Sequence, residues 1–322
     1  MSDEQYIYAV ARIRSKELGL LDKSALEQLM SSKSYEECYR LLMDKGWGRT
    51  GDETAEQLLV VEREKTWSLI SELVEDMSAF NTFLYGNDFH NLKAAIKQVY
   101  VNKEVPNTYL NNGTIDPEII LNAVKKHDFS DLPEHMRECA EEAYQVQMHT
   151  GDGQLCDIIV DKAALDTIYR KGKESNNELF AEYAELKVAA ANINIAVRGC
   201  KTKKNKEFYI KSLAECESLD IKKLSEAALG GEEAIYEYLL NTVYSDAVSA
   251  IKESPSAFER WCDNLIMRHI KPQKYNPFSI SPLAAYILAR ENEIKSVRIL
   301  LSGKINDLPE DSIRERLREM YV

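Results

Sequence analysis

Helical periodicity constrains this chain more than any other feature of its sequence. Its apolar residues recur mainly at spacings of three and four, and only 8 prolines and 13 glycines interrupt 322 residues. In the stretch 56–84 charged residues separate apolar residues at this spacing, as on an amphipathic helix. These apolar residues include Leu69, Leu73, Met77 and Phe80. The sequence therefore predicts an all-α fold.

The same pattern divides the chain into expected helices separated by loops. The expected helices span residues 2–17, 24–43, 56–84, 87–99, 117–126, 133–148, 154–169, 177–199, 219–229, 232–251, 256–268, 283–302 and 310–320. Proline, glycine and asparagine cluster in the loops 102–116, 127–133, 199–206 and 270–282. No loop is long or biased enough to be a disordered linker, so residues 1–322 are expected to form one domain.

Charge and composition exclude several classes of function. A hydrophobic fraction of 44% supports a packed core, and a net charge of −12 disfavours nucleic acid as a partner. No apolar stretch approaches the roughly 20 residues that cross a bilayer. The six cysteines form no Cys-x-x-Cys pair, and the N-terminus does not resemble a secretory signal. We expect a soluble cytoplasmic protein with reduced, buried cysteines that reaches a membrane only through protein partners.

Motifs that carry chemistry are scarce. Residues 46–51 match the dinucleotide pattern G-x-G-x-x-G, but they follow an expected helix instead of a strand, which favours a helix C-cap with Gly46 in the left-handed conformation. The sequence has no P-loop motif, and its five histidines lack zinc-ligand spacing. We therefore expect no catalytic, cofactor-binding or metal-binding residues and no small-molecule substrate. The lysine-rich run 201–206 is either a solvated loop or a docking site for acidic lipid or protein.

One five-residue pattern recurs along the chain. NLKAA at 91–95, ELKVA at 185–189 and EIKSV at 293–297 share it, and each is followed by a loop and another amphipathic helix. The approximate repeats are centred near 88–130, 180–230 and 283–322, with a looser copy near 6–43. Helical repeats pack in arcs or around an axis and offer concave binding surfaces.

Several stretches resemble one known family. They are YAVARIR at 8–14 with Leu20 and Leu21, FHNLKAA at 89–95, NPF at 276–278, YILARENEIKSVR at 286–298 and the terminal RERLREMYV at 314–322. Together they are similar to the V/A-type ATPase subunits called C in bacteria and archaea and d in eukaryotes.

This resemblance implies a funnel of helices with three structurally similar subdomains and pseudo-three-fold symmetry. It also implies a non-catalytic rotor subunit that joins the central shaft to the membrane proteolipid ring and transmits torque for ATP-coupled H+ or Na+ transport. Its partners would be the shaft subunits and the ring, and its location the cytoplasmic face of a membrane. The isolated chain would be a monomer.

Cations recur on the repeated helices at spacings that place them on one side. In an acidic protein they are expected to form a basic stripe that helps to hold an acidic shaft. The candidate shaft-binding residues are Arg12, Lys16, Lys93, Lys97, Lys187, Arg198, Lys295 and Arg298. The alternative is that these cations pair with carboxylates on adjacent helices of the same chain.

Two other functions compete with the rotor interpretation. A free-standing helical-repeat scaffold could bind a partner helix or peptide in its concave face. An α-helical enzyme could also assemble its site from scattered residues that no spacing rule detects.

Overall fold

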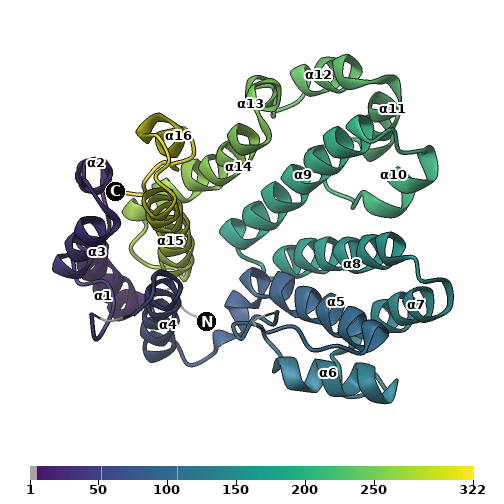
Figure 1. Cartoon of the computed structure of the whole chain (residues 1–322), viewed down its shortest axis with the longest axis horizontal. Coiled ribbons are helices and arrows are strands. Elements are labelled where there is room, and N and C mark those ends of the chain that lie inside the picture. The colour runs from purple at the N-terminus through teal and green to yellow at the C-terminus, as the bar shows by residue number, and fades with distance from the viewer. Residues whose placement is uncertain (1–5, 52, 107) are drawn as a thin grey trace. The chain divides into compact units, whose positions relative to one another are not determined.

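The computed structural model describes residues 6–51, 53–106 and 108–322, and in these ranges helices are its only regular elements (Figure 1). The all-α prediction is confirmed. The chain forms two compact units, which we call the terminal unit (Met1–Met77 with Asp246–Val322) and the central unit (Ser78–Ser245). None of the described helices combines the length and the apolar character needed to cross a bilayer. The arrangement of three similar subdomains about an axis stays a prediction.

The terminal unit is built around α15 (Ser281–Ile305), which is buried without interruption from Ser281 to Ile287. This mostly apolar first part of the helix gains free energy by burial, and α15 packs against α1, α3, α4, α14 and α16. The other helices of this unit are α1 (Ile7–Glu17), α2 (Lys23–Met30), α3 (Tyr35–Asp44), α4 (Ala55–Leu73), α13 (Ala247–Glu253), α14 (Pro255–Ile270), the 3-10 helix η3 (Lys271–Tyr275) and α16 (Glu310–Arg314).

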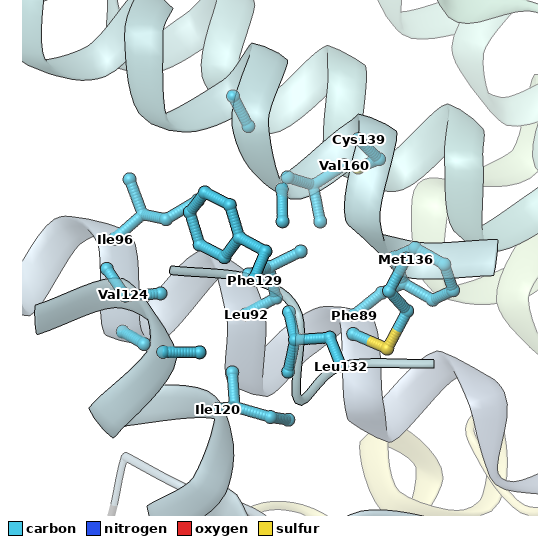
Figure 2. Packing of buried hydrophobic residues seen from close by; sticks show 14 of the residues in the cluster. Phe89, Leu92, Ile96, Ile120, Val124, Phe129, Leu132, Met136, Cys139 and Val160 are labelled. Atoms are coloured by element: carbon cyan, nitrogen blue, oxygen red, sulfur yellow. The ribbon is translucent and has the colours of Figure 1, made fainter. Parts of the chain in front are cut away.

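The central unit stacks its longer helices in succession. Within it α8 packs against α5, α7 and α9, and α9 also contacts α10, α11 and α12. Figure 2 shows one of its cores, where side chains from α5, α6, α7 and α8 meet. The helices of this unit are α5 (Tyr85–Val101), α6 (Pro117–Lys126), α7 (Glu134–Thr150), α8 (Gly153–Glu174), α9 (Glu178–Lys201), α10 (Lys206–Ser212), α11 (Ile221–Gly230) and α12 (Glu232–Leu240), preceded by the 3-10 helix η2 (Met77–Phe83).

Three expected helices are each interrupted. The stretch 24–43 breaks into α2 and α3 because Ser34 has an extended backbone and its hydroxyl accepts the Glu37 amide at 3.2 Å. The stretch 56–84 stops at Val74, which is extended, and resumes as η2. The stretch 232–251 breaks after Asn241, where the Thr242 hydroxyl accepts the Tyr244 amide at 3.1 Å. Serine and threonine side chains thus compete with the helical ladder at two of the breaks.

Smaller differences concern helix ends. Residues 206–212 form α10, a helix absent from the expected set, and only Glu310–Arg314 of the stretch 310–320 is helical. Residues 2–5 of the first expected helix lie outside the described residues. Of the six cysteines Cys38, Cys139 and Cys156 are buried as predicted, whereas the other three are half-buried. Burial raises the pKa of the Cys139 thiol to about 12 and that of Cys156 to about 11, which makes both poor nucleophiles at neutral pH.

Candidate functional site

Apart from residues 89–95 on α5, the stretches that carry the family resemblance belong to the terminal unit. Arg14, from the N-terminal stretch, donates to the carbonyls of Gln273 and Asn276 at 2.5 and 2.9 Å. Lys304, near the C-terminus, donates to the carbonyl of Met30 at 2.6 Å. Charged hydrogen bonds to backbone carbonyls fix loops against helices, so these residues hold the frame of the unit.

Arg290 on α15 is the centre of a buried ion network. Only 6% of Arg290 is exposed, and its guanidinium donates to the carboxylates of Glu62 on α4 and Glu293 on α15, which are 3% and 2% exposed. The guanidinium also lies 5.0 Å from the centroid of the Trp47 ring. Burial raises the pKa of Glu293, and Arg290 opposes that rise. The cation therefore offsets the cost of burying two carboxylates.

The network reaches beyond the two helices that carry it. The Glu62 carboxylate also accepts the Gly48 amide at 2.8 Å and the Lys65 ammonium at 2.7 Å. The Glu293 carboxylate accepts the backbone amide of Leu21, in the turn after α1. One group of charges thus joins α15, α4, the glycine-rich loop and the end of α1.

The glycine-rich loop 46–51 follows α3 and precedes α4, so no strand leads into it. Gly46 has φ +85°, and its amide donates to the Met43 carbonyl at 2.9 Å, while the Trp47 amide reaches the Leu42 carbonyl at 3.1 Å. These bonds satisfy carbonyls at the end of α3. The predicted helix C-cap at Gly46 is confirmed.

The remaining amides of this loop are already bonded to carboxylates. The Glu53 carboxylate accepts the amides of Arg49, Thr50 and Gly51 at 2.7, 3.0 and 2.9 Å. The bonds from Thr50 and Arg49 lower the pKa of Glu53 to about 2, so it is ionised at neutral pH. A phosphate-binding loop offers such amides to its ligand, whereas here a side chain of the chain itself occupies them.

A basic pocket of about 430 Å3 opens beside this loop within the terminal unit. Its wall includes the aromatic rings of Trp47 and Tyr286 and the carboxylates of Glu62 and Glu72. Among the residues that line it, six cations outnumber these two carboxylates, in a chain of net charge −12. The cations that line it are Arg12, Lys16, Lys45, Arg49, Lys65 and Arg290.

The six cations differ in how far they are neutralised. Glu62 and Glu293 neutralise Arg290 and Lys65, and Arg49 pairs with Glu64 at 3.4 Å. By contrast, the other three cations are exposed and form no ion pair with any described residue, so their charge is available to a partner. These uncompensated cations are Arg12, Lys16 and Lys45.

Four of the eight candidate shaft-binding cations pair within their own unit. On α5, Lys93 and Lys97 each lie 2.6 Å from a carboxylate of α8, Asp161 and Asp157 respectively. On α15 the partner of Lys295 is Asp263, at 2.7 Å, and the partner of Arg298 is Glu56, at 3.0 Å. Pairing within the chain, the alternative interpretation, thus describes these four cations.

The other four candidates form no ion pair with the described part of the chain. Lys187 and Arg198 are exposed on α9, and Arg12 and Lys16 are exposed on α1. The structure brings Arg12 and Lys16 together at the basic pocket, as their spacing of four predicts. A role of these residues in holding a shaft stays a prediction.

Two buried asparagines, one on α5 and one on α9, each hold a later segment of the chain through a pair of backbone bonds. The Asn91 side chain on α5 donates to the Leu110 carbonyl and accepts the Leu110 amide, both at 2.8 Å. The Asn192 side chain on α9 makes the same pair of bonds with Ala214, at 2.7 and 3.0 Å. Each asparagine fixes the segment that precedes the next repeat helix, α6 or α11.

The lysine-rich run 201–206 forms the turn between α9 and α10. Lys204 donates to the Gln154 side chain at 2.9 Å and lies 5.6 Å from the centroid of the Phe208 ring, while Asn205 caps α10. In the ranges that the structure describes, histidine, cysteine and acidic side chains do not gather in threes as a metal site would require.

Comparison with known proteins identifies the family. The family described as ATP synthase (C/AC39) subunit matches residues 9–316. The chain is 22% identical to the C subunit of the V-type sodium ATPase of Enterococcus hirae over 317 residues, 96% of this chain and 97% of the relative. It is 26% identical to the C subunit of the A-type ATP synthase of Methanocaldococcus jannaschii, with 97% and 86% of the two chains covered.

A further relative, the C subunit of the V-type ATP synthase of Thermus thermophilus, is 22% identical with 98% of this chain and 99% of the relative covered. The similarity therefore extends over nearly the full length of each protein. It includes both the terminal unit and the central unit. This chain belongs to the ATP synthase (C/AC39) subunit family of rotary V/A-type ATPases.

Proposed function

We propose that this chain is the non-catalytic rotor subunit that joins the central shaft of a V/A-type ATPase to the proteolipid ring in the membrane. In this role it transmits torque for ATP-coupled transport of H+ or Na+. The observation that carries the proposal is the family match over residues 9–316. A match of this length covers nearly the whole chain, whereas a single motif could occur in unrelated proteins. The chain would sit peripherally on the cytoplasmic face, held by its partners, and be a monomer when isolated.

The chemistry of the chain supports this proposal. A coupling subunit needs rigid interfaces and no reacting groups. Charged residues in the stretches that resemble the family, such as Arg14, Arg290 and Glu293, bind other groups of the same chain. The glycine-rich loop, which could suggest a nucleotide site, is closed by Glu53.

Reconstitution of the complex with and without this chain tests the function. With the chain, proteoliposomes should couple ATP hydrolysis to ion uptake. Without it, the soluble head and shaft should still hydrolyse ATP while ion uptake is lost, because the shaft no longer drives the ring. Equal ion uptake in both preparations would refute the coupling role. A free-standing scaffold would leave coupling unchanged and would not associate with shaft or ring.

A charge-reversal variant tests three of the eight proposed shaft-binding cations. Lys93→Glu with Arg198→Glu and Arg298→Glu should weaken shaft binding and nearly preserve the melting temperature, because exposed ion pairs contribute only about 0–1 kcal/mol. Higher salt should weaken wild-type binding. Reversal of the exposed Lys125 and Lys126 on α6 is the control. Unchanged shaft affinity with a lower melting temperature would show that these cations are structural.

A further inference from the structure

The basic pocket of the terminal unit concentrates positive charge that the chain itself leaves uncompensated. Arg12 and Lys16 reach it from α1, and Lys45 reaches it from the end of α3. Because all three are exposed and make no ion pair with described residues, an anionic partner would meet them without first breaking an internal pair. The deeper wall is fixed, since Arg290 is held by Glu62 and Glu293 and lies over Trp47.

The surroundings of the pocket favour protein carboxylates over phosphate. A phosphate site usually combines free backbone amides with cations, but the amides of the neighbouring loop are donated to Glu53 and Glu62. Two carboxylates, Glu62 and Glu72, also line the pocket and would repel a compact polyvalent anion. An acidic protein segment can place individual carboxylates beside the mouth cations and keep clear of these two groups.

We propose that this pocket is the docking site for an acidic segment of the central shaft, whose Asp and Glu side chains pair with Arg12, Lys16 and Lys45. The inference rests on the proposed coupling function and assigns the shaft contact to one concave site of the terminal unit. Lys45 enters here as a shaft-binding residue alongside Arg12 and Lys16. The volume of about 430 Å3 accommodates a few side chains and not a whole helix. Only the tip or one face of the segment therefore enters.

Paired charge reversals test the site. The test variant is Lys16→Glu with Lys45→Glu, and the matched control is Lys23→Glu with Lys33→Glu, which reverses two exposed lysines of the same unit outside the pocket. Binding of the purified shaft subunits of the same organism is measured at ionic strengths of about 0.01 M and about 0.15 M. Circular dichroism melting verifies that both variants fold.

The expected result is a loss of shaft affinity of about tenfold or more in the test variant, with a smaller salt dependence than the wild type and an unchanged control. Wild-type affinity in the test variant, or equal losses of affinity in the test and control variants, would refute the assignment of the pocket as the shaft-binding site. Either result would leave the proposed coupling function unaffected. Failure of the wild-type chain itself to bind the shaft would remove the coupling function and the pocket with it. Saturable binding of inorganic pyrophosphate that the test variant loses would assign the pocket to a small anion and overturn the proposal.

Discussion

Replacing Arg290 by methionine should destabilise the terminal unit much more than replacing Arg63 by methionine. Both arginines join α4 and α15 by binding a carboxylate across the two helices. The Arg290 and Glu62 side chains are 8% and 4% exposed, whereas those of Arg63 and Glu291 are 24% and 28% exposed. The two substitutions therefore compare the same kind of bond between the same helices at different burial.

The magnitudes follow from what each substitution leaves behind. Without Arg290, the buried carboxylates of Glu62 and Glu293 lose their shared cation, and breaking such a buried pair costs about 3–5 kcal/mol. Without Arg63, Glu291 can turn toward solvent, and the loss should be only about 0–1 kcal/mol. Adding Glu62→Gln and Glu293→Gln to Arg290→Met should recover part of the lost stability, because amides are less costly to bury than unpaired charges.

Tryptophan fluorescence in urea provides the assay. All three tryptophans of the chain, Trp47, Trp67 and Trp261, belong to the terminal unit, so their emission reports its unfolding. With a denaturant slope of about 2 kcal/mol per molar, a loss of about 3 kcal/mol lowers the midpoint by about 1.5 M. Arg63→Met should lower it by less than about 0.5 M. Equal midpoints for the two variants would refute the assigned role of the buried network.

Three further predictions concern other parts of the fold. Because the pKa of Glu53 falls from its ordinary 4.5 to about 2 on folding, its stabilisation is complete above about pH 4.5 and is lost as the pH falls toward 2. The urea midpoints of wild type and Glu53→Gln should thus converge below pH 4.5, and a pH-independent gap would contradict this. Gly199→Ala should cost about 1–3 kcal/mol by circular dichroism, because the new Cβ would lie 2.7 Å from the buried Tyr209 ring; Gly86→Ala, with no atom within 4 Å, should be neutral or stabilising. Asn192→Leu should cost about 2–4 kcal/mol and speed hydrogen exchange at the Ala214 amide, since it leaves a buried amide and carbonyl unpaired. Unchanged exchange would argue against the assigned role of the Asn192 side chain.

Much of the fold is predictable from the sequence because helical periodicity acts over short distances. Long segments such as α8, α9 and α15 lie close to their expected positions. The breaks were harder to foresee. Ser34 could have been a tolerated residue inside a helix, and only its extended backbone and its bond to Glu37 show that a second helix starts there. A local hydrogen bond can stop a helix without changing the apolar pattern on either side.

The candidate site, too, is only partly predictable from the sequence. Arg12 and Lys16 belong to one helix, so a spacing of four predicts that they share a face, and both line the pocket. Lys45, Arg49 and Lys65 reach the same pocket from other segments, and no spacing rule relates residues that only tertiary packing brings together. For the same reason the sequence does not predict that Lys93 pairs with Asp161 or that Arg298 pairs with Glu56, because each carboxylate lies on another helix.

Burial separates charged residues that hold the frame from those that remain available to a partner. Arg290 is inside and satisfied, and exchanging its carboxylates for those of another protein would leave buried charges unpaired. The carboxylates that pair with Lys93 and Arg298 are exposed, and such pairs can be exchanged for a partner's carboxylates at little cost, so internal pairing does not remove these cations from the proposed shaft contact. Arg12 and Lys16 need no exchange and should contribute most. Because the pocket they share is backed by Arg290 on α15, a shaft segment docked there would press directly on the central helix of the terminal unit. In the proposed function, the buried network around Arg290 would then transmit the force from the shaft to α4 and to the end of α1.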